Sequence, residues 1–351
     1  MTYSQVAVRV LAFLALTPAA AGAICCPVGP PDQFIQSSGQ INLVIRNGDD
    51  VRLIPNIRFS GDANDFALIV PTPALPALTP VDGGIWSEAA RLTAPQTRRR
   101  SGSGGLDCGG AGVESAGVAD DRAFTDGLTI HSQLTVGAFD ATIVTSTDPS
   151  ALTTWLIDNG YLADSTVTSA FDPLAADGWF FTAMKLRSGT PVPNGGWDTT
   201  VDPVEFRYTA PEFDLPLDVV SINAATRHAM TVYVVDAHRV TLPRFRTRYS
   251  NRISGTEATA IADLYPVLAS YLGRGTTLTR LDRTFQTGQL TGTLRLEAAA
   301  TDDEFREVVQ GSGLPGDLLV LAAPFLWFKL QPPWRRRRGG PIDVEPDTRA
   351  T

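Results

Sequence analysis

Short runs rich in β-branched residues recur along this chain of 351 residues, each ended by proline, glycine or asparagine–glycine. The clearest run covers residues 41–46, meets Asn47-Gly48 and resumes as residues 51–54, a pattern typical of a β-hairpin. Residues 66–70 form a continuous apolar run, as in a strand buried on both faces, and prolines follow it. With 31 glycines and 25 prolines, the chain is predicted to be rich in strands and turns.

Helical patterns are few and short. We expect helices over residues 85–92, 151–157, 257–272 and 302–309. Asp148 begins the second helix as its cap, and Pro266 kinks or interrupts the third. The fold class is therefore predicted to be α+β, with sheets rich in antiparallel strands and a few packing helices.

Two pairs of segments share spaced residues. Residues 66–76 resemble residues 206–216, and residues 135–145 resemble residues 231–241. This pattern predicts two related α+β modules. The alternative is a chance match between segments of similar β-rich composition.

The first 23 residues are typical of a secretory signal peptide. Arg9 precedes a short apolar run over residues 10–16, Pro18 breaks that run, and Ala21-Gly22-Ala23 provides a site for signal peptidase. The alternative is a short N-terminal helix. A membrane-spanning helix is not expected here, because the apolar run is too short to cross a bilayer. We therefore expect residues 24–302 to form an exported domain, located in the periplasm or cell envelope.

An oxidising location outside the cytoplasm permits disulfides. The candidates are the three cysteines Cys25, Cys26 and Cys108. Adjacent cysteines pair poorly because the geometry is strained, so Cys26–Cys108 or Cys25–Cys108 is the expected bridge. A reactive thiol at the mature N-terminus is the functional alternative.

The C-terminal region divides into three parts. Residues 303–317 are expected to form a linker or short helix, and residues 318–334 are strongly apolar. Residues 335–351 begin with four arginines and are expected to continue as a disordered tail. Aromatic residues beside a basic cluster favour a membrane anchor, whereas the short run and Pro324 favour a helix docked on the domain. Membrane attachment through this segment is therefore one of two open interpretations.

The overall charge argues against nucleic-acid binding. The formal net charge is −8 and the isoelectric point is about 5.0. Arginines do cluster at residues 98–100, 244–252 and 335–338, but no groove with interleaved aromatic residues accompanies them. Cysteine and glycine motifs for a metal, a cofactor or a phosphate-binding loop are absent from the sequence, so none is predicted.

The weak catalytic candidates are Asp236 and His238. On one extended strand these two side chains would share a face, about 7 Å apart at ~3.3 Å per residue. Such a pair suits a general base and its orienting carboxylate, and an ordinary surface pair at a strand end is the alternative.

Several motifs, taken in order, resemble those of the bacterial domain-of-unknown-function family 2330. They occupy residues 66–73, 152–161, 206–217, 233–240 and 279–281. A signal peptide followed by a cysteine pair is also similar to that family, and the resemblance covers about residues 25–300. It implies an extracytoplasmic bacterial protein and brings no activity or ligand. We therefore expect a cell-envelope protein with a binding or structural role; the alternative is an extracytoplasmic hydrolase using Asp236 and His238.

Overall fold

The computed structural model describes residues 26–28, 35–61, 67–98, 124–125, 127–161, 165–187 and 202–310. The chain divides into two compact units. The larger comprises Met1–Gln96 and Cys108–Glu307, and the smaller Thr97–Asp107 and Val308–Thr351. The described part of the smaller unit belongs to strands β6 (Gln96–Arg98) and β20 (Val308–Gln310), which pair in a two-stranded sheet.

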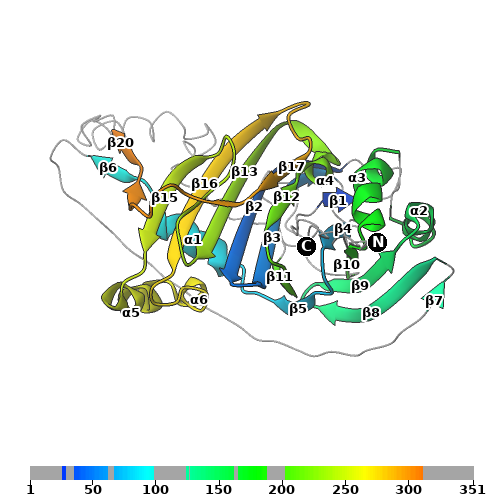
Figure 1. Ribbon diagram of the computed structural model, residues 1–351, viewed down its shortest axis with the longest axis horizontal. Helices are drawn as coiled ribbons and strands as arrows, with labels where there is room; N and C mark the ends of the chain where they lie inside the picture. Colours follow the sequence, from blue (N-terminus) through cyan, green and yellow to red (C-terminus); the bar gives the residue numbers. More distant parts are fainter. Residues whose placement is uncertain are drawn as a thin grey trace, which may run out of the picture. The chain divides into compact units, whose positions relative to one another are not determined.

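An eight-stranded sheet forms the centre of the larger unit (Figure 1). Its strand order is β19-β15-β16-β13-β2-β3-β11-β5, and every pair is antiparallel except β13 with β2. The strands are β2 (Ile35–Asn47), β3 (Asp50–Gly61), β5 (Ala77–Pro80), β11 (Val204–Thr209), β13 (Ala224–Asp236), β15 (Arg246–Arg252), β16 (Thr277–Gln286) and β19 (Phe305–Arg306).

The hairpin predicted over residues 41–54 is confirmed as part of β2 and β3. Asn47 pairs with Asp50, so Gly48 and Asp49 make the turn. Gly48 has φ 60°, a backbone conformation that glycine adopts at little cost. Glycine at the first central position is the preference of a tight two-residue hairpin, and it fixes the register of both strands.

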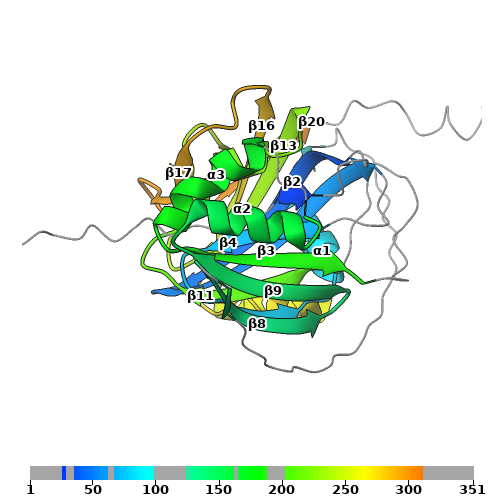
Figure 2. The ribbon, with the colours of Figure 1, turned by 90° about the vertical axis from the view of Figure 1, so that its right-hand side faces the viewer.

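A second sheet of six antiparallel strands has the order β1-β4-β10-β9-β8-β7. Its strands are β1 (Cys26–Val28), β4 (Ala67–Thr72), β7 (Phe124–Thr125), β8 (Leu128–Val136), β9 (Phe139–Ser146) and β10 (Phe180–Leu186). Helices α2 (Pro149–Asp158) and α3 (Ser165–Ala176) cover one face (Figure 2). The rings of Phe171 in α3 and Phe181 in β10 meet edge to face at 5.4 Å, which fixes α3 on that face.

Both faces of the eight-stranded sheet are buried, because neighbouring residues point to opposite sides. Val44 and Leu53 belong to the core shared with the six-stranded sheet, whereas Leu43 and Ile54 belong to the other core. Three helices complete that second core: α1 (Gly84–Leu92), α5 (Gly255–Leu264) and α6 (Pro266–Ala269). The result is a layered α+β fold, as predicted.

Two short strand pairs and one short helix close the larger unit. They are β12 (Asp214–Pro216) with β17 (Thr293–Arg295), β14 (Val240–Thr241) with β18 (Glu297–Ala298), and α4 (Leu217–Ser221). Leu215 and Leu217 from these elements, and Leu296 between β17 and β18, join the core shared by the two sheets.

Three of the four predicted helices are present. Asp148 caps α2 by accepting a hydrogen bond from the backbone N–H of Ser150, and α5 ends before Pro266, where α6 begins. The helix predicted over residues 302–309 is wrong, because β19 and β20 are strands: β19 pairs with β15. Helix α3 was not predicted, since its serine- and threonine-rich start and Pro173 oppose helix formation.

The two related modules are not seen in the second pair of similar segments. Residues 135–145 turn back at Gly137, which has φ 55°, and form the β8–β9 hairpin. Residues 231–236 instead continue straight along β13. The two segments of this pair thus follow different backbone paths, because only the first has a glycine at the turn.

Among the described residues, none of the helices has the length and apolar character needed to cross a bilayer. The predicted signal peptide, the apolar segment 318–334 and the tail 335–351 lie outside the described residues.

Candidate functional site

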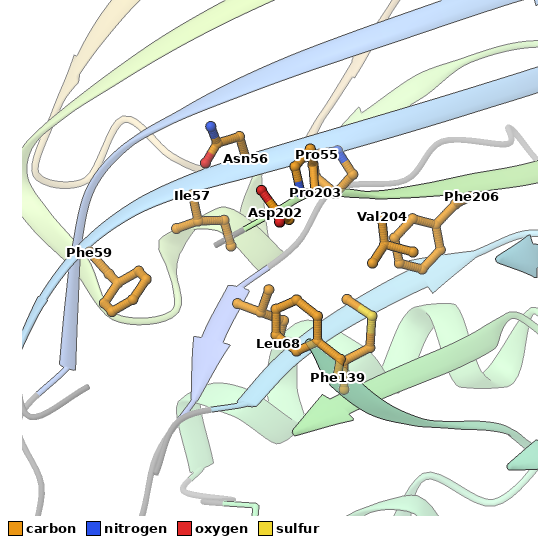
Figure 3. Close-up of a pocket in the computed structure, with 11 residues that line it drawn as sticks. Pro55, Asn56, Ile57, Phe59, Leu68, Phe139, Asp202, Pro203, Val204 and Phe206 are labelled. Carbon is orange, nitrogen blue, oxygen red and sulfur yellow. The ribbon is translucent and has the colours of Figure 1, made fainter. Parts of the chain in front are cut away.

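One hollow lies between the two sheets, and its volume is about 30 Å³. Figure 3 shows Phe59, Leu68, Phe139 and Phe206 around it. Since one water needs roughly 10–15 Å³ measured this way, the hollow has room for a few atoms at most. It is a gap in core packing rather than a site for a small molecule.

The second hollow is much larger, at about 370 Å³, which lies in the usual size range of small-molecule sites. We call it the arginine concavity. It lies between the turn after β14, the end of β16, the loop to β17, and the start of α4. The residues that line it are Leu217, Pro243, Arg244, Arg283, Gly288, Gln289, Thr291 and Leu294.

Arg244 reaches the concavity from a strained turn. The backbone N–H of Phe245 donates to the carbonyl oxygen of Leu242 at 3.0 Å, so Pro243 and Arg244 are the two central residues. Arg244 has φ 65°, where turns with proline at the preceding position normally carry glycine. Such a conformation costs a residue with a side chain roughly 1–2 kcal/mol. Backbone strain of this kind is concentrated at functional sites.

Arg283 enters the concavity from β16 and is held by aromatic rings. Its guanidinium carbon lies 4.0 Å from the centre of the Phe285 ring and 6.0 Å from that of Phe245. One guanidinium nitrogen, Nη1, donates to the carbonyl oxygen of Pro243 at 3.5 Å. These contacts restrict the orientation of the guanidinium group before any ligand binds.

The two arginines bring two positive charges into one concavity. Partial burial and the positive charge of Arg244 lower the pKa of the Arg283 guanidinium. In the described part of the chain, neither residue forms an ion pair. Arg295 nearby in sequence differs, because it contacts both Glu212 and Asp214. The concavity is therefore suited to a negatively charged group.

The rest of the lining provides a neutral hydrogen-bond donor and an apolar surface. The side-chain oxygen Oε1 of Gln289 accepts from the backbone N–H of Gln286, so its NH₂ group remains a donor. The accessible apolar surface comes from Leu294 and Pro243, whereas Leu217 in the same lining is buried. The site can thus hold an oxyanion together with an apolar group.

The structure gives Asp236 and His238 different partners. Strand β13 ends at Asp236, so His238 lies beyond it, and the Asp236 carboxylate contacts Arg46 at 3.5 Å. The ring nitrogen Nδ1 of His238 lies 2.7 Å from Oδ2 of Asp302. His238 and Asp302 have side chains 67% and 41% exposed, and neither lines a hollow described above. The bond from His238 helps to lower the pKa of Asp302.

Cys26 has a free, fully buried thiol in β1, so Cys26–Cys108, one of the two expected bridges, is not formed, and Cys25–Cys108 stays a prediction. The strand pairs with β4 and turns the side chain into the core, where burial raises the pKa of the thiol. That burial also opposes a reactive role for Cys26. Cys25 and Cys108 lie outside the described residues.

Sequence reasoning noted arginines between residues 244 and 252 but assigned no site to them. One local pattern does predict the turn at residues 242–245, because proline favours the second position of a turn and Pro243 occupies it. Nothing in the sequence connects Arg283 to that turn.

Comparisons with known proteins place the chain in a bacterial context. A family model described as "Uncharacterized protein conserved in bacteria (DUF2330)" matches residues 18–297. A search of curated proteins found no match. Two solved structures of baculovirus P35 match weakly. One is its crystal structure, with 8% identity over 78% of this chain and 98% of that chain, at a TM-score of 0.30. The other is a mutated form after caspase cleavage, with 9% identity over 76% and 98%, at a TM-score of 0.28. A likeness this distant assigns neither a fold nor a function.

Proposed function

The chain belongs to the bacterial protein family DUF2330, and we propose that it is an exported cell-envelope protein that binds an anionic ligand in the arginine concavity. One observation carries the binding part of this proposal. Arg244 and Arg283 line the same concavity, and neither has an ion pair among the described residues. Two like charges kept together at the expense of backbone strain favour a role in binding over a role in stability.

Binding is tested with inorganic phosphate on the full chain at low ionic strength, because salt screens such attraction. A ligand that binds only the folded state raises the unfolding temperature, and at about 100 times its dissociation constant it adds about 2.7 kcal/mol. We expect this shift in the wild type and its loss in Arg244→Ala and in Arg283→Ala.

Arg91→Ala is the matched control. Arg91 is exposed on α1, outside the concavity, and its removal changes the net charge by the same amount. The control should keep the full phosphate-induced shift. An absent shift in the wild type, or an equal loss in the control, would contradict anion binding.

The export part of the proposal is supported by the leader sequence of residues 1–23. Cell fractionation with N-terminal sequencing tests it: the mature chain should begin at Ile24 and be recovered outside the cytoplasm. Recovery from the cytoplasm with Met1 intact would contradict it.

Membrane attachment through residues 318–334 is a further part of the proposal, supported by their apolar composition and the arginines that follow. A chain shortened to end at residue 317 should leave the membrane fraction and appear in the soluble extracytoplasmic fraction. If the full chain is already soluble, the segment is a docked element instead.

The hydrolase alternative now depends on the 2.7 Å contact of His238 with Asp302, because Asp236 contacts Arg46. With Nδ1 directed at a carboxylate, Nε2 of His238 is the nitrogen left for a reacting group. This alternative predicts ester hydrolysis that His238→Ala abolishes and Arg283→Ala preserves. Hydrolysis that survives His238→Ala would exclude it.

A further inference from the structure

We propose that the arginine concavity binds a phosphate monoester attached to an aliphatic group, an amphipathic dianion rather than a bare inorganic ion. This inference rests on the anion binding proposed above and specifies the class of ligand. Three observations support it: the charge of the two arginines, the separate elements that carry them, and the apolar part of the lining.

Charge favours a dianion. Arg244 and Arg283 together contribute two positive charges, and no described carboxylate is paired with either. A carboxylate carries one negative charge and would leave one guanidinium unbalanced. A phosphate monoester carries close to two charges at neutral pH and offers three oxygens to two donors.

The origin of the two arginines suits a tetrahedral group. Arg283 belongs to the strand β16 and is fixed against Phe285, whereas Arg244 belongs to the turn after β14. Because the two guanidinium groups come from separate elements, they can donate to different oxygens of one phosphate. Gln289 supplies a further neutral donor in the same lining.

The apolar part of the lining calls for more than a phosphate. The volume of about 370 Å³ far exceeds the space of a five-atom oxyanion. Leu294 on β17 and Pro243 in the turn after β14 face this space, the first half-buried and the second exposed, whereas Leu217 in the same lining is already buried. An aliphatic group on the ligand would remove that surface from water, which adds affinity in proportion to the area covered.

Titration calorimetry with inorganic phosphate, ethyl phosphate, hexyl phosphate and hexanoate tests the inference on the full chain. Each methylene buried on binding is worth about 0.8 kcal/mol, or roughly fourfold in affinity. We expect hexyl phosphate to bind at least ~10-fold more tightly than inorganic phosphate, with two or more methylenes buried. Hexanoate should bind more weakly than hexyl phosphate.

Variants separate the two halves of the site. Leu294→Ala should reduce the advantage of hexyl phosphate over inorganic phosphate, whereas Leu264→Ala should leave it unchanged, because Leu264 is 66% exposed on α5. Arg283→Ala should abolish binding of both phosphates. If Leu294→Ala fails to fold, the rise in affinity from ethyl to hexyl phosphate in the wild type provides the same test.

The outcomes distinguish this inference from the broader proposal. Equal affinity for inorganic and hexyl phosphate, or tighter binding of hexanoate, overturns the ligand class and leaves anion binding in place. No binding of any anion overturns both. Where hexyl phosphate binds as expected, the full chain is sedimented with phosphatidylcholine vesicles with and without phosphatidic acid. More sedimentation with phosphatidic acid, lost in Arg283→Ala, identifies a lipid source. Equal sedimentation with both vesicles identifies a soluble ester.

Discussion

The inter-sheet hollow and the arginine concavity differ in how they are built. The inter-sheet hollow lies among regular strands and is lined mainly by apolar side chains, with a volume of about 30 Å³. The arginine concavity is built from a strained turn, a loop and the ends of β16 and β17, with a volume of about 370 Å³. Strands packed face to face exclude ligands, whereas loops around a rigid sheet leave space and place charge in it. The comparison is consistent with a packing role for the first region and with the proposed binding role for the second.

The largest effect is expected from Phe206→Ala, which removes a fully buried ring beside the inter-sheet hollow. Deleting such a side chain costs about 3–5 kcal/mol of unfolding free energy, because the existing gap grows and packing contacts are lost. Urea denaturation measures this loss. Phosphate affinity of the folded variant should stay at the wild-type value, and a loss below about 1 kcal/mol would mean that this layer contributes little.

Asp214→Asn is expected to affect both stability and binding. The buried Asp214 carboxylate accepts two hydrogen bonds from Arg295 at 3.1 and 3.2 Å, and this joins β12 to β17 beside Leu294. Hydrogen bonds to charged groups contribute about 1.5–3 kcal/mol, so we expect a loss of that size and weaker phosphate binding. Asp140→Asn, at an exposed pair 4.0 Å from Arg187, should cost less than about 1 kcal/mol.

Asn42→Leu tests whether the inter-sheet layer is only a packing layer. Asn42 is fully buried, both polar atoms of its amide lack a hydrogen-bond partner among the described residues, and Pro55 of the hollow lies opposite. A buried unpaired amide costs about 1–3 kcal/mol, so an apolar side chain of similar shape should raise stability by about 1 kcal/mol. Thermal unfolding measures it. A fall in stability would instead indicate a polar partner between the sheets.

Arg244→Gly is expected to have the smallest effect on stability but a decisive one on binding. Glycine accepts φ 65° without the side-chain strain, so the unfolding free energy should rise by about 0.5 kcal/mol after glycine's own entropy cost. Phosphate binding should be lost at the same time. Arg244→Ala should lose binding without gaining stability, since alanine retains the strain. A variant that gains stability and still binds would remove Arg244 from the site.

Local signals in the sequence determined much of the fold. The hairpin at Gly48, the cap at Asp148 and the helix break at Pro266 each depend on residues within a few positions of one another. The strand-rich α+β class and the family follow from such segments taken in order. The wrong helix prediction lies in residues 302–309, where the sequence carries no strong local signal. Pairing with β15 made residues 305–306 a strand.

Only the tertiary structure decided the site. Arg244 and Arg283 are separated along the chain by β15, α5 and α6, and they meet because Arg246 at the start of β15 pairs with Asp282 on β16. The same holds for His238, which meets Asp302 rather than Asp236. Turns and caps depend on neighbours in the sequence, so a sequence can specify them directly. Contacts between distant side chains depend on strand register and layer packing, which the whole set of buried residues decides together.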